Sequence, residues 1–173
     1  MKTVDFHAHT TYSDGALTPI ELRNLMRDRG VTHFSVTDHD AIGANRELEE
    51  RGPDGMLFVT GIELTTHYRE KTLHLLAYGF NPENSTLADF LMRQRLARRK
   101  RAEEIVWLLN IDLAKEGYAP IPLEAILALE VEWPITRPDI AKYLIKIGYV
   151  KDFREAFDRW LRNYNVPLDS ADI

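Results

Sequence analysis

The first half of the chain contains four short apolar stretches, and each one carries or runs directly into histidine or carboxylate side chains. The stretches cover residues 3–6, 31–37, 56–60 and 72–78. Each is short and ends near glycine or polar turn residues, which predicts β-strands. Helical patterns lie between the strands, so the order indicates an α/β fold with a parallel sheet. Such sheets place their functional groups at the carboxyl ends of the strands, where the ionisable residues of this chain fall.

Two helices are predicted between the strands and several more after them. Thr18 can cap the first helix, with Pro19 at its first position, Glu21 completing a capping box and Gly30 ending it. The second covers about residues 41–50. After residue 85 the pattern is helical throughout, with Thr136 and Asp152 as later caps and helices at 86–116, 122–129, 138–147 and 152–161. The second half is therefore expected to be all helical.

The ionisable residues near the strand ends are suited to bind metal ions. His7 and His9 are two residues apart on a strand, so both imidazoles project from one face, with Asp5 on the same face as a candidate supporting partner. Asp14 follows in a polar turn that ends at Gly15. The chain has no cysteine, so only imidazoles and carboxylates can be ligands. The candidate ligands are His7, His9, Asp14, His39, Glu63 and His74.

Each of these residues also has a structural explanation when taken alone. A lone strand histidine such as His74 is more often a hydrogen-bonded core residue than a ligand. Asp14 is ordinary in a turn, and Asp38 and Asp40 could cap the helix that follows them. Glu63 could be a solvated strand end. The joint occurrence of histidine or carboxylate at every predicted strand end favours the metal site.

The balance of charged residues excludes a uniformly basic nucleic-acid-binding surface. The 173 residues include 22 Lys and Arg against 27 Asp and Glu, a net charge of −5. One local basic run remains, consisting of Arg93, Arg95, Arg98, Arg99, Lys100 and Arg101. This run is either a solvated helix surface or an electrostatic guide for a nucleotide or short RNA. Neither a signal-peptide core nor a membrane-spanning window occurs, so we expect a cytoplasmic chain with no membrane partner.

Four ordered motifs in the first half resemble those of the PHP (polymerase and histidinol phosphatase) superfamily. They are Asp5-Phe6-His7-Ala8-His9-Thr10 with Ser13-Asp14-Gly15, then Thr37-Asp38-His39-Asp40, Gly61-Ile62-Glu63, and His74-Leu75-Leu76-Ala77-Tyr78-Gly79. Residues 136–141 and 148–157 resemble the helical insertion of one branch of that superfamily. Members of this branch remove the 3′-phosphate from nucleoside 3′,5′-bisphosphates, and some trim short RNA from the 5′ end. The resemblance covers nearly the whole chain and implies a metal-dependent phosphoesterase.

The resemblance also implies an architecture, which is the N-terminal part of a distorted, seven-stranded βα barrel with an all-helical insertion domain. On this basis we expect a barrel portion of about four strands at residues 1–83. The insertion would cover residues 84–165. Residues 166–173 would begin the return to the barrel.

The resemblance further implies that the six candidate ligands hold two or three divalent metal ions. Manganese is the first expectation, and zinc or iron are alternatives for imidazole and carboxylate ligands. Asp5 and Asp38 would support the ligands, and Arg137 would contact a substrate phosphate. The implied assignments are His7 and His9 for one metal, Glu63 bridging to a second, His74 on that second metal, and Asp14 with His39 on a third.

The sequence departs from the family pattern in its later ligands. The family pattern has a histidine in an Ala-His-Pro context and a closely spaced Asp and His near its end, and neither has a counterpart here. Three explanations stay open. The chain is a fragment of a longer enzyme, or a second copy or another chain supplies the missing strands, or it is a reduced, non-catalytic module that binds metal or phosphate. A small-molecule phosphatase of the histidinol-phosphatase type is the competing enzyme, and the helical insertion argues against it.

Overall fold

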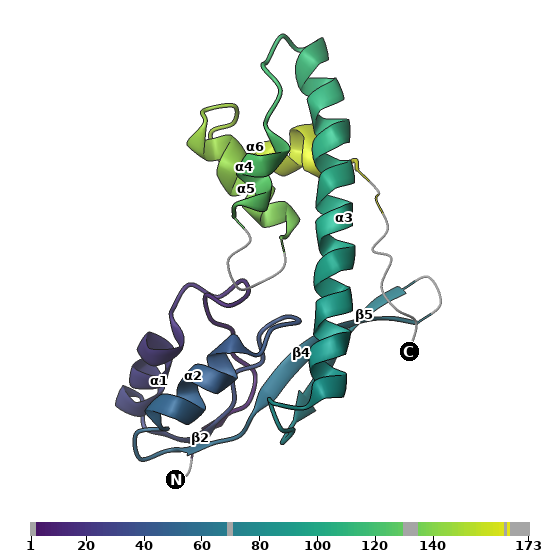
Figure 1. Ribbon diagram of the computed structural model, residues 1–173. Coiled ribbons are helices and arrows are strands. Elements are labelled where there is room, and N and C mark those ends of the chain that lie inside the picture. The colour runs from purple at the N-terminus through teal and green to yellow at the C-terminus, as the bar shows by residue number, and fades with distance from the viewer. Residues whose placement is uncertain (1–2, 69–70, 130–134, 165, 167–173) are drawn as a thin grey trace. The chain divides into compact units, whose positions relative to one another are not determined.

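Three short parallel strands joined by two helices begin the chain, and Figure 1 labels the two helices as α1 and α2. The computed structural model describes residues 3–68, 71–129, 135–164 and 166. Strands β1 (Thr3–Asp5), β2 (Val31–Phe34) and β3 (Leu57–Phe58) pair in parallel in that order. Helix α1 (Pro19–Asp28) connects β1 to β2, and α2 (Gly43–Arg51) connects β2 to β3. The predicted mixed α/β fold with parallel pairing is confirmed for these strands.

The next two strands form an antiparallel hairpin. Strand β4 (Gly61–Tyr68) pairs with β5 (Lys71–Tyr78), and an isolated parallel bridge between His39 and Glu63 joins β4 to the segment that follows β2. The predicted parallel pairing therefore does not extend to the strand expected at 72–78, which pairs antiparallel with β4. Strand β4 was not predicted, because its polar residues Thr65 and Thr66 break the apolar pattern while being buried in the fold.

Local signals fix the first helix as predicted. The Glu21 backbone N–H donates to Thr18 Oγ1 at 3.3 Å, and Glu21 Oε2 accepts from the Thr18 backbone N–H at 2.9 Å, which completes the capping box. Gly30 follows the helix with a φ of 75°, a conformation that glycine adopts without strain. The helices pack on the sheet through a core of Leu22, Met26, Phe34, Val36, Ala44, Leu48 and Met56.

The second half of the described chain is helical, as predicted. Its helices are α3 (Ser85–Lys115), α4 (Leu123–Leu127), α5 (Arg137–Lys146) and α6 (Phe153–Ala156), which continues into the π-helical turn η1 (Phe157–Leu161). None of the helices in the described ranges has the length and apolar content that a membrane span requires.

The chain divides into two compact units, and the division falls within α3, between Arg93 and Gln94. The second unit has a core of its own, which includes Ile105, Leu109, Leu113, Ile126, Ile140, Leu144 and Leu161. Both predicted caps are present in it. Asp139 Oδ2 accepts from the Thr136 backbone N–H at 3.0 Å, and Asp152 Oδ1 accepts from the Glu155 backbone N–H at 2.8 Å.

Candidate metal centre

The six candidate ligands come from separate elements of the first unit and converge around one carboxylate. Two follow β1, one lies in the turn before α1, one follows β2, and one each lies within β4 and β5. Glu63 was predicted at the end of the strand at 56–60, whereas it lies inside β4. Listed from the N-terminus, the six converging residues are His7, His9, Asp14, His39, Glu63 and His74.

Glu63 is the shared partner of the histidines. Its Oε2 atom lies 2.9 Å from His7 Nε2 and 3.0 Å from His9 Nε2. Its Oε1 atom lies 2.8 Å from His74 Nδ1, and its Oε2 atom lies 3.8 Å from His39 Nδ1. The carboxylate is buried, with 8% of its side chain exposed. One buried carboxylate therefore contacts imidazoles from several segments at once.

Asp14 closes the opposite side of the cluster. Its Oδ1 atom lies 3.1 Å from His9 Nδ1, and its Oδ2 atom lies 3.8 Å from His39 Nε2. The imidazole rings are also close to one another, with centroids 4.7 Å apart for His9 and His39 and 4.7 Å apart for His39 and His74. The cluster is thus a continuous row of rings with a carboxylate at each side.

The arrangement fits divalent metal ions. Three overlapping groups each bring their ligand atoms within 4.8 Å of one another, namely His7 with His9 and Glu63, His9 with Asp14 and His39, and His39 with Glu63 and His74. His39 Nδ1 is buried without a hydrogen-bond partner in the described part of the chain, and a buried polar atom of this kind is costly unless it is satisfied. Imidazole nitrogens with carboxylate oxygens suit manganese, zinc or iron.

The protonation of the centre also suits cation binding. Burial lowers the pKa of His39, with the neighbouring His9 and His74 acting in the same direction and Glu63 and Asp14 opposing it. This favours the neutral imidazole, which is the form that binds metals. Burial acts to raise the pKa of Glu63, but hydrogen bonds from the histidines and their charge outweigh it and lower the pKa overall. Glu63 is therefore held as a carboxylate.

Asp38 anchors the turn that carries two of the candidate ligands. It is fully buried, and its Oδ1 atom accepts from the Thr10 backbone N–H at 2.7 Å and from Ser13 Oγ at 2.6 Å, while Oδ2 accepts from Thr10 Oγ1 at 2.6 Å. Thr10 and Ser13 both lie between His9 and Asp14 in the sequence. Asp38 thus ties the segment after β2 to the turn after β1.

Neither Asp38 nor Asp40 caps the following helix, since α2 begins after Ile42 and has no side-chain cap bond. Asp40 instead accepts from the Thr65 backbone N–H at 2.8 Å, which fastens its segment to β4. Asp5 is exposed, and its Oδ1 atom accepts from the backbone N–H of His7 at 3.2 Å.

Gly15 is needed where the turn passes close to the backbone of the ligand segment. A Cβ at this position would lie 2.2 Å from the His9 carbonyl oxygen and 2.6 Å from the Thr10 nitrogen. The glycine therefore allows the turn to approach His9. The roles of Thr10 and Ser13 were missed in the sequence, where the only signal was their position beside the histidine and aspartate.

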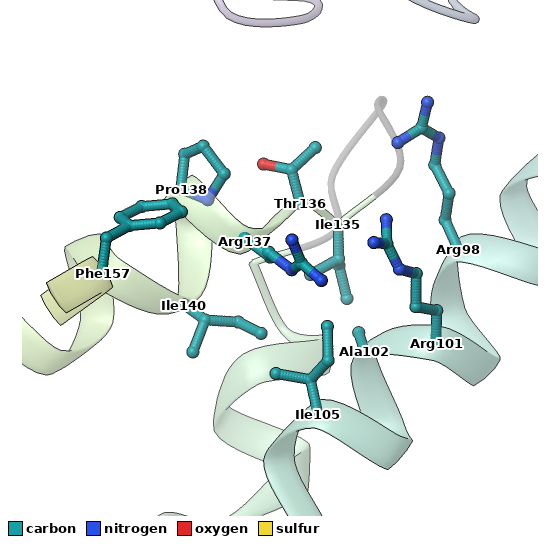
Figure 2. Close-up of a pocket in the computed structure, with 10 residues that line it drawn as sticks. All are labelled: Arg98, Arg101, Ala102, Ile105, Ile135, Thr136, Arg137, Pro138, Ile140 and Phe157. Atoms are coloured by element: carbon teal, nitrogen blue, oxygen red, sulfur yellow. The ribbon is translucent and has the colours of Figure 1, made fainter. Parts of the chain in front are cut away.

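Arg137 lies in the second unit, at the first residue of α5. Its guanidinium donates from Nη2 to the backbone carbonyl of Tyr164. It lines a pocket with Arg98 and Arg101 of the basic run (Figure 2).

Comparison with known proteins gives several relatives that match almost the whole chain. A 5′-3′ exoribonuclease from Haemophilus influenzae is 32% identical, over 99% of this chain and 62% of its own length. A 3′,5′-nucleoside bisphosphate phosphatase from Chromobacterium violaceum is 30% identical, over 93% of this chain and 55% of its own length. No protein-family model matches the sequence.

A solved structure also resembles the chain over almost its whole length. A candidate metal-dependent phosphoesterase from Bifidobacterium adolescentis superimposes with a TM-score of 0.79 at 26% identity, over 99% of this chain and 60% of that one. These similarities support the PHP superfamily for the chain. Its PHP motifs are therefore those that converge at the centre described above. This PHP chain spans 55 to 62% of the length of the two relatives named here.

Proposed function

We propose that this PHP protein is a metal-dependent phosphoesterase that hydrolyses a phosphate monoester or terminal phosphodiester of a nucleotide. The substrate would be a nucleoside 3′,5′-bisphosphate or the 5′ end of a short oligonucleotide. The observation that carries this proposal is the convergence of six ligand-type side chains on the buried Glu63 carboxylate. The names of the two relatives support the substrate class.

The three ligand groups would hold two or three divalent cations, with manganese proposed first and zinc or iron as alternatives. When bound, such cations supply Lewis acidity toward a phosphoryl oxygen and lower the pKa of water. Glu63 would be shared between cations, because its two oxygens face different histidines. The side chains of His7 and His74 are 52% and 45% exposed, so a substrate phosphate can approach the centre from solvent.

The supporting residues would keep the ligands in place. Asp38 holds the turn of His9 and Asp14 through three short hydrogen bonds, and fixed ligands lose less entropy on binding. Asp5 would steady the backbone at His7. Arg137 would contact a substrate phosphate, for which its planar guanidinium is well shaped.

The family architecture is part of the same proposal. Residues 1–83 would form the N-terminal portion of a PHP barrel, and residues 84–165 would form a helical insertion. Within the described ranges, β1 pairs only with β2 and β5 only with β4, and Val4, Leu73 and Leu75 are exposed. Further strands, from a longer form of the chain or from a second chain, would cover such edges. The proposed return to the barrel at 166–173 lies outside the described residues except for Val166.

Metal analysis combined with a hydrolysis assay tests the proposed function. The purified protein is expected to contain manganese, zinc or iron and to release phosphate from adenosine 3′,5′-bisphosphate in the presence of added Mn²⁺. Treatment with a chelator should abolish phosphate release, and Mn²⁺ should restore it, because the proposed reaction depends on the divalent cations that the ligand groups would hold.

Two results would contradict this proposal. Metal binding without hydrolysis of any nucleotide would favour a non-catalytic metal-binding module. Faster hydrolysis of histidinol phosphate than of the bisphosphate would favour a small-molecule phosphatase.

A further inference from the structure

Three arginine side chains line one pocket within the second unit. Arg98 and Arg101 extend from α3, and Arg137 extends from the start of α5 (Figure 2). The pocket has a volume of about 320 Å³, at the lower end of the range of roughly 300–1,000 Å³ that is typical of small-molecule sites. Figure 2 shows the Arg101 and Arg137 guanidiniums next to each other in the pocket.

The rest of the lining is mostly apolar. Ile105, Ile135, Ile140 and Phe157 contribute to it, together with Thr136. In Figure 2 the cationic groups of α3 lie on one side of the pocket and Phe157 lies on the other. The pocket therefore offers cationic donors for one end of a ligand and an apolar surface for the other.

The charges of Arg101 and Arg137 are not neutralised by carboxylates within the described part of the chain. Arg101 donates from Nε to the Val166 carbonyl at 2.8 Å, and Arg137 donates from Nη2 to the Tyr164 carbonyl. Backbone carbonyls orient a guanidinium without cancelling its charge. Arg137 Nε is moreover buried without a hydrogen-bond partner among the described residues, which leaves a donor available to a ligand.

The three cations also act on one another. Burial lowers the pKa of Arg101, and the positive charges of Arg137 and Arg98 lower it further. Burial lowers the pKa of Arg137 as well. Like charges held together in a partly buried site are unfavourable, and a bound anion would relieve this repulsion.

We propose that Arg98, Arg101 and Arg137 form an oxyanion pocket that binds a phosphate monoester group without help from a metal ion. Guanidinium forks match the oxygens of a phosphate in paired hydrogen bonds, and a phosphate carries enough negative charge for several of them. The organic part of the ligand lies against Ile140 and Phe157. The inference rests on the proposed function at one point, the contact of Arg137 with phosphate. It adds Arg98 and Arg101 as phosphate-binding residues, and it adds an affinity for phosphate that does not depend on metal.

The same pocket distinguishes the two explanations of the basic run. Arg98 and Arg101 line the pocket. Arg99 instead forms an ion pair with Glu103, four residues further along α3, with its Nε atom 3.6 Å from Glu103 Oε1. Only part of the run therefore belongs to the binding site, and the rest of α3 carries ordinary surface charge.

Calorimetric titration of the metal-free protein with inorganic phosphate tests the pocket. The wild-type protein is expected to bind phosphate saturably at fixed ionic strength, and Arg101→Gln is expected to weaken this binding at least 10-fold. Arg98→Gln provides a second variant if the first does not fold. Arg154→Gln is the matched control, since the Arg154 side chain lies on α6 and is 90% exposed. This variant should bind phosphate with wild-type affinity.

The proposal is overturned if wild-type protein binds phosphate no more tightly than the folded Arg101→Gln and Arg98→Gln variants, or if Arg154→Gln loses as much affinity as they do. The titration contains no metal, so it is independent of hydrolysis. A protein that binds phosphate here and hydrolyses nothing would keep the pocket and contradict only the proposed function.

Discussion

Replacing Glu63 with glutamine is expected to lower the affinity for Mn²⁺ by at least ~100-fold and to reduce nucleotide hydrolysis to background. Residues that only support metal ligands already change affinity by about 10- to 100-fold. Glu63 lies within 3.0 Å of three imidazole nitrogens. The variant keeps the size of the side chain but loses the negative charge that two ligand groups share.

Calorimetric titration with Mn²⁺ measures this effect, alongside a phosphate-release assay. The matched control is Glu49→Gln, because Glu49 is exposed on α2 outside the ligand groups. The control should bind Mn²⁺ with wild-type affinity and stoichiometry. Wild-type affinity and stoichiometry for Mn²⁺ in the folded Glu63→Gln variant would mean that the centre has been assigned to the wrong residues.

Replacing Asp38 with alanine is expected to lower the free energy of unfolding by on the order of 3–5 kcal/mol and to weaken metal binding. The change leaves three donors of Thr10 and Ser13 without their acceptor. Each buried donor that loses its partner costs about 1–3 kcal/mol. The metal effect follows because the freed turn carries Asp14 and adjoins His9.

Urea unfolding measures the loss of stability, and Mn²⁺ titration measures the loss of affinity. Asp38→Asn keeps an acceptor for the Thr10 N–H and should lose less of both, so it also serves if the alanine variant does not fold. Asp28→Asn is the control. Asp28 is exposed and pairs with Arg27 at the surface, where an ion pair contributes less than about 1 kcal/mol. A stability equal to wild type in both Asp38 variants would remove the anchoring role.

Local chemistry made the helices and the cluster of ligand-type residues predictable. The capping boxes at Thr18 and Thr136 depend on residues three positions apart, so the sequence contains the whole signal. His7 and His9 share a strand face through the two-residue period of a β-strand. The joint occurrence of ligand-type residues correctly predicted which side chains come together, although the role of each residue taken alone was ambiguous.

Long-range contacts account for what the sequence did not predict. Strand β4 exists because its backbone pairs with β5 and because the Thr65 N–H bonds to Asp40, 25 residues away. Periodicity also could not tell which cations of the basic run line a pocket. That depends on where α5 places Arg137, which is 36 positions beyond Arg101 in sequence.

The most direct test of the metal centre is anomalous scattering, collected at the manganese edge from crystals of the protein grown with Mn²⁺. We expect manganese peaks within bonding distance of imidazole nitrogens of His7, His9 and His74 and of the carboxylate of Glu63. Crystals in which manganese is absent from these side chains, or is bound only elsewhere on the protein, would contradict the proposed metal centre.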